Sequence, residues 1–69
     1  MPWYYLINSQ HIVFTSLQAS AIGHISHMLG DECHWIGVVH HATSETEAKQ
    51  QALDQFYKAY PLKSLKVGA

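Results

Sequence analysis

The sequence contains no arginine, one cysteine and two prolines, both near its ends. Without arginine, four lysines supply all the basic side chains against five acidic ones, and the formal charge at neutral pH is −1. A protein that binds duplex nucleic acid normally presents a basic face, because neutralising phosphates drives its affinity. The composition therefore argues against a general duplex-binding protein.

The lone cysteine, Cys33, excludes a disulfide within the chain and is typical of a reducing compartment. The sequence has neither an apolar run of the roughly 20 residues that span a bilayer nor the charged start of a signal peptide. We therefore expect a cytoplasmic protein. With 69 residues it should form one domain of marginal stability, which a second copy, a larger partner or a metal would support.

The first 15 residues are rich in aromatic and β-branched side chains, which favour strands. They predict one strand over residues 3–8 and a second over residues 11–15. The polar residues Asn8, Ser9 and Gln10 favour a turn between them. A β-hairpin is the simplest connection.

Residues 16–29 are ambiguous. Ser16 is a potential helix cap, but Gly23 and Ile25 weaken a helix. We favour a loop followed by a third strand over residues 22–29. A turn at Gly30 then leads into a fourth strand over residues 33–41.

The carboxy-terminal third predicts a helix over about residues 45–60. Ser44 and Glu47 have the spacing of a capping box, and Pro61 cannot continue a helix. Residues 62–67 are expected as either a short last strand or a loose tail. The predicted fold is α+β, an antiparallel sheet of three to five strands with one C-terminal α-helix packed on one face. The residues expected on the core side of the helix are Ala48, Ala52, Phe56, Ala59 and Tyr60.

Both faces of the predicted sheet are apolar, whereas one helix covers only one face. An exposed apolar face usually marks an interaction site. We therefore predict that the second face self-associates or binds a protein target, unless residues 16–21 or the carboxy-terminal tail cover it. The predicted interface residues are Tyr4, Leu6, Val13, Trp35 and Val39.

Six histidines are unusual in so short a chain. His27, His34 and His40 could converge on one face of the predicted sheet and are weak candidates for metal ligands. A single cysteine and the lack of paired ligand spacing argue against a structural zinc site. We expect no metal or other cofactor.

A catalytic role for Cys33 is also disfavoured. Adjacent residues of a strand point to opposite sides, so His34 could not act as the base for the Cys33 thiol. The sequence offers no other set of catalytic residues. We expect the protein not to be an enzyme.

The stretch from His41 to Ala48, a strand that runs into a capped helix, resembles the same join in AP2-type and integrase arm-binding domains. Those families read DNA with the face of a sheet. This chain departs from them, because its strands carry histidine, tryptophan and valine where those families place arginines. The resemblance implies an alternative function as a nucleic-acid-binding module, in which sheet aromatics stack on unpaired bases.

In its small size and lack of a catalytic set, the chain also resembles small proteins of phages and mobile elements that inhibit larger host machinery. We therefore predict a non-enzymatic protein-binding module, an inhibitor of a larger host protein or complex, which also forms a homodimer. The alternatives are the nucleic-acid-binding module and a small histidine-based metal-binding protein.

Overall fold

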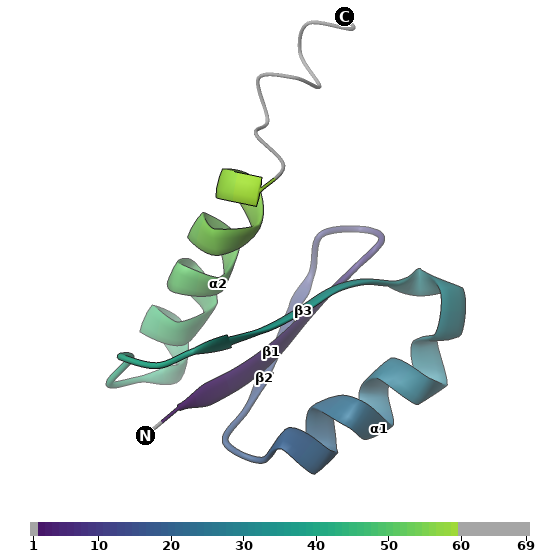
Figure 1. The fold of residues 1–69 in the computed structure, drawn as a ribbon, viewed down its shortest axis with the longest axis horizontal. Helices are drawn as coiled ribbons and strands as arrows, with labels where there is room; N and C mark the ends of the chain where they lie inside the picture. The colour runs from purple at the N-terminus through teal and green to yellow at the C-terminus, as the bar shows by residue number, and fades with distance from the viewer. Residues whose placement is uncertain (1, 60–69) are drawn as a thin grey trace, which may run out of the picture.

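The computed structural model describes residues 2–59. The elements are, in order, β1 (Trp3–Asn8), β2 (Val13–Ser16), α1 (Ala19–Leu29), the short 3-10 helix η1 (Gly30–Glu32), β3 (Cys33–Val39) and α2 (Glu45–Ala59). The strands form an antiparallel sheet in the order β2-β1-β3, and the two helices lie on opposite sides of it (Figure 1). The predicted α+β class and the packing of the C-terminal helix on one face are confirmed.

β1 is the central strand and is buried on both sides. Tyr5 and Ile7 belong to the core under α2, whereas Leu6 points to the opposite face, which α1 covers. A strand covered on both faces is apolar at consecutive positions, as β1 is. This strand therefore links two thin layers of core.

The connection between β1 and β2 is organised by Asn8, a buried polar residue. Its side-chain carbonyl accepts the backbone N–H groups of Gln10 and Ile12, each at 2.9 Å. His11 adopts a left-handed conformation with φ of 65° and donates its N–H to the Asn8 carbonyl at 2.9 Å. Asparagine commonly makes such local turns. The second strand therefore begins at Val13, two residues later than the predicted residue 11.

The third strand predicted over residues 22–29 is wrong, because this segment is the helix α1. Ile22 is buried, and Ile25 and Leu29 are half-buried on the same side. Their spacing of three and four residues matches a helix face. Gly30 ends the helix with a positive φ of 56° and donates its N–H to the Ser26 carbonyl.

α2 begins at the predicted capping motif. The Ser44 hydroxyl accepts the Glu47 N–H at 3.2 Å, and the Glu47 carboxylate accepts the Thr43 N–H at 2.7 Å, one residue before the expected partner. Ala48, Ala52 and Phe56 are buried against the sheet as predicted, whereas Ala59 is exposed.

Two further predictions fall at the chain's end. The predicted helix end at Tyr60 and the strand or tail over residues 62–67 lie outside the described residues. Neither α1 nor α2, the helices of the described part, is long and apolar enough to cross a membrane.

Candidate functional site: the edge of strand β3

The five predicted interface residues do not share one surface. Leu6 and Val39 are fully buried within the chain. Tyr4 is half-buried and lies on the α1 face of β1, whereas Val13 and Trp35 are half-buried against the core under α2. The prediction of a single exposed face made of these residues is therefore wrong.

The pairing register explains the error. The turn after Asn8 pairs Ile7 with Val13, so Val13 lies on the face of Ile7 and not on that of Leu6. Trp35 also pairs with Ile7, because β3 adds to the far side of β1. Sequence reasoning had instead placed Trp35 in a hairpin with residues 22–29, which form a helix.

An unusual exposed feature is β3 itself. It is an edge strand of seven residues that contains no lysine, arginine, aspartate or glutamate. Edge strands usually carry lysine, proline or other features that prevent pairing with another chain. In Figure 1, β3 is the strand nearest the viewer, and no described element lies in front of it. Its outer edge is therefore covered by no described helix or strand.

Ile36, at the centre of β3, is 51% exposed. The cause is the position of α1, which packs mainly against β1 and β2 and leaves the β3 end of this face open. Val38 lies on the same face and is half-buried. The outer edge of β3 thus combines accessible backbone with an apolar side chain in water.

The direction of the backbone groups follows from the β1–β2 turn. Asn8 donates its N–H to the Ile12 carbonyl, so at Asn8 the backbone of β1 faces β2. Because the direction alternates along an antiparallel strand, Ile36 and Val38 of β3 turn their groups away from β1. The Gln55 side-chain amide reaches the Val38 carbonyl at 3.3 Å, which agrees with this direction. The residues whose groups bond β1 are Trp35, Gly37 and Val39.

The residues that flank β3 are acidic at its start and histidines at its end. Asp31 and Glu32, both exposed, precede the strand within η1. His40 and His41, also exposed, follow it, and their ring centroids are 6.3 Å apart. The strand therefore runs from an acidic end to an imidazole end.

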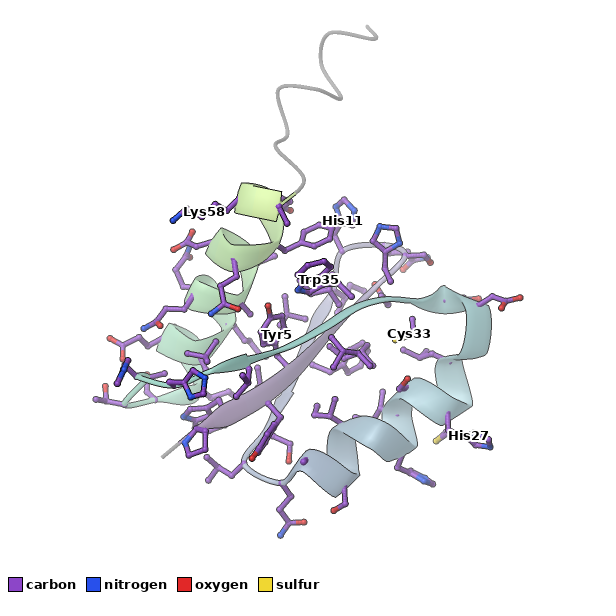
Figure 2. All side chains as sticks on the ribbon, viewed as in Figure 1. Tyr5, His11, His27, Cys33, Trp35 and Lys58 are labelled. Carbon is purple, nitrogen blue, oxygen red and sulfur yellow. The ribbon has the colours of Figure 1, made fainter. Side chains whose placement is uncertain are left out.

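A hydrogen-bond chain fixes β3 to β1 and α2. Trp35 donates its indole N–H to the Tyr5 hydroxyl at 2.9 Å, and Tyr5 donates to the Gln55 carbonyl oxygen at 2.8 Å. Figure 2 shows Tyr5 and Trp35 pointing into the space between sheet and α2. Burial raises the pKa of the Tyr5 hydroxyl above its usual value, an effect opposed by the bond from Trp35. The hydroxyl therefore stays protonated and serves as a structural link.

A small β-bulge separates the start of β3 from its regular part, between Ile7 and Asn8 of the facing strand. A bulge places two residues of one strand opposite one of its partner, and so re-aims a side chain. The rings of His34 and Trp35 consequently both lie near Phe56, with centroid distances of 5.7 and 5.9 Å. His11 from the hairpin turn joins the same cluster, 6.0 Å from His34.

The three candidate ligands His27, His34 and His40 do not lie together. His27 lies on α1, His34 at the start of β3, and His40 after β3. His27 projects from the outer side of α1 in Figure 2. Within residues 2–59, no three or more histidine, cysteine or acidic side chains gather in a way that could hold a metal ion.

The arrangement also departs from the resemblance to sheet-based DNA readers. Trp3, Tyr5 and Trp35 pack in or against the core under α2, and α1 occupies much of the opposite face. The described residues thus present no open aromatic sheet face for stacking on bases.

Sequence reasoning missed three residues that shape this site. Ile36 was not among the predicted interface residues, and Gly37 and Gln55 were given no role. The helical spacing of Ile22, Ile25 and Leu29 was an available signal for α1, and hence for the open position of Ile36. The contacts of Gln55 and Gly37 with Tyr5 depend on the sheet register, for which the sequence has no signal.

Comparison of the chain with protein-family models, with curated proteins and with solved structures finds no match. Its function is therefore inferred from its own residues.

Proposed function

We propose that this chain is a non-enzymatic protein-binding module and that the outer edge of β3, with Ile36, is its binding element. The observation that carries the proposal is a seven-residue edge strand without lysine, arginine, aspartate or glutamate, whose central side chain is half exposed. A partner strand that pairs with β3 would bond the outward backbone groups of Ile36 and the outward N–H of Val38, whose carbonyl already accepts the Gln55 side-chain amide. Strand addition of this kind takes affinity from main-chain hydrogen bonds and specificity from alternate side chains.

The apolar face beside the edge adds to the binding energy. Fully burying an exposed isoleucine contributes about 1.5–3 kcal/mol, and Ile36, which is 51% exposed, can gain about half of that. The Tyr5, Trp35 and Gln55 hydrogen bonds hold the strand in place before binding. A preformed edge reduces the entropy that binding would otherwise cost.

The proposed partner is a larger host protein or complex that this chain inhibits by occupying its surface. The small size of the chain supports this class of function. So does the absence of a catalytic set among its described residues. The partner's own exposed strand or loop would extend the sheet beyond β3.

The test compares two lysine substitutions at equally exposed isoleucines. Ile36→Lys places a charge on the binding edge, and Ile12→Lys places the same charge in the β1–β2 turn, where the side chain is 50% exposed. Tagged parent and both variants are used to capture partners from a lysate of the source organism, with quantitative mass spectrometry as the readout. We expect one protein other than the bait to be retained by the parent and by Ile12→Lys, but lost with Ile36→Lys. Equal capture by all three baits would contradict the proposal.

A further inference from the structure

We infer that the β3 edge also takes a second copy of this chain, through antiparallel pairing of the two β3 strands about a two-fold axis at Ile36. The inference rests on the proposed binding role of this edge. Each chain has a three-stranded sheet with β3 at its border, so the pair would form one continuous sheet of six strands. A two-fold pairing presents the same surface from both chains, and therefore requires a self-complementary edge.

The backbone limits the possible registers. The two edges can form hydrogen bonds only where a residue whose backbone groups point outward lies opposite another such residue. In the regular part of β3 these residues are Ile36 and Val38. Two-fold axes at Ile36, Gly37 or Val38 meet this condition. The backbone alone therefore leaves three registers.

The charged and imidazole side chains at the ends of β3 favour one of these three registers. An axis at Ile36 brings the acidic end of one strand, Asp31 and Glu32, beside the imidazole end of the other, His40 and His41. The two-fold symmetry makes this contact twice. An axis at Gly37 or Val38 slides the acidic residues past the histidines toward residues 42–45. Complementary charges fix the register of an interface and disfavour wrong pairings.

The side chains also fit the register at Ile36. The exposed Ile36 of each chain meets its equivalent, which removes an apolar side chain from water in both chains. On the opposite face, Trp35 lies across from Gly37 of the second copy. Gly37 has no side chain of its own, and the Tyr5 ring lies over it at that position.

The pairing should depend on pH with a defined sign. An imidazole is positively charged only when it is protonated, so its attraction to a carboxylate is stronger at the lower pH. Association should therefore strengthen between pH 8 and pH 6. Within one chain, His40 and His41 face each other, and the acids of the neighbouring first turn of α2 are engaged, Glu45 with Thr15 and Glu47 with Thr43.

The test is a charge swap. One variant carries Asp31→Lys and Glu32→Lys, and the other carries His40→Glu and His41→Glu. In a dimer of the first variant lysines lie beside histidines, and in a dimer of the second variant glutamates lie beside Asp31 and Glu32. Neither pairing is attractive, so the dissociation constant of each dimer should be at least about tenfold higher than the parent's. In a mixture, both end contacts become attractive, and a heterodimer should form. Analytical ultracentrifugation at pH 6 and 8 measures the masses, and circular dichroism checks that each variant is folded.

Three results would overturn the inference: a parent protein that stays monomeric at both pH values, a dimer that Ile36→Lys leaves intact, or a mixture without heterodimer. A monomeric parent whose capture of another protein is still abolished by Ile36→Lys would retain the proposed binding function and remove only the second copy as occupant.

Discussion

Tyr5 joins the three elements that build the main core. Its hydroxyl accepts a hydrogen bond from Trp35 of β3 and donates one to Gln55 of α2, so no buried polar atom of this ring is left without a partner. Its ring lies across Gly37, its pairing partner in β3. A side chain at position 37 would begin 2.5 Å from the Tyr5 hydroxyl oxygen. The absence of a side chain at Gly37 is therefore a requirement of the packing.

This contact predicts opposite effects of the same change at two glycines. Gly37→Ala should destabilise the fold by roughly 1–3 kcal/mol, because the added methyl group displaces the Tyr5 ring. Gly23→Ala is the control: this helical position in α1 has no atom within 4 Å of the added methyl group. It should stabilise the fold by roughly 0.5–1 kcal/mol, because alanine favours helix. Urea unfolding of the variants measures both, and a Gly37→Ala protein as stable as the parent would refute the Tyr5 contact.

At the scale of elements, α2 illustrates what local chemistry controls. Its start is set by Ser44 and Glu47, which bond backbone N–H groups that would otherwise lack a partner in the first turn. Its core side is set by Ala48, Ala52 and Phe56, spaced four residues apart. Both features reside in contiguous sequence.

The cap can be tested directly. Ser44→Ala removes the hydroxyl that accepts the Glu47 N–H and should lower the free energy of unfolding by about 1 kcal/mol. Thr46→Ala, at an exposed position in the same turn, should not lower it, because alanine is the better helix former. Thermal melts followed by circular dichroism provide the comparison. Coincident melts of Ser44→Ala and the parent would show that the cap does not stabilise α2.

The elements that could be predicted from the sequence are those with strong local patterns. β1, β3 and α2 have strong local patterns, and their positions are close to the predictions. α1 contains Gly23 and the β-branched Ile22 and Ile25, which lower intrinsic helix propensity. Its helical form is stabilised by packing on the sheet, a tertiary effect that outweighs propensity in short helices.

The candidate site could be predicted less well, because its residues are brought together by strand pairing and not by local sequence. Once residues 22–29 are treated as a strand, Trp35 and Val39 are assigned to the wrong face of the sheet. The bulge that turns His34 toward Phe56 likewise depends on how two distant strands pair. The apolar character of the surface could be predicted, but its location could not.

On the scale of the whole molecule, a three-stranded sheet lies between two helices, and three of the nine buried apolar residues in the described part are alanines. A core of this size supplies limited stability. Pairing through β3 would extend the sheet, cover Ile36 and remove the exposed edge. Association and folding stability should therefore be linked in this protein.

Amide hydrogen exchange at Ile36 tests pairing through β3, because this N–H points away from β1, toward the side where a partner strand would lie. It is measured by NMR at pH 6, with the protein well above and well below its dimerisation midpoint. We predict that the Ile36 amide is protected at high concentration and loses protection on dilution, while the Gly37 amide, bonded to β1, is protected at both. An Ile36 amide that exchanges equally fast at both concentrations would contradict pairing through the edge of β3.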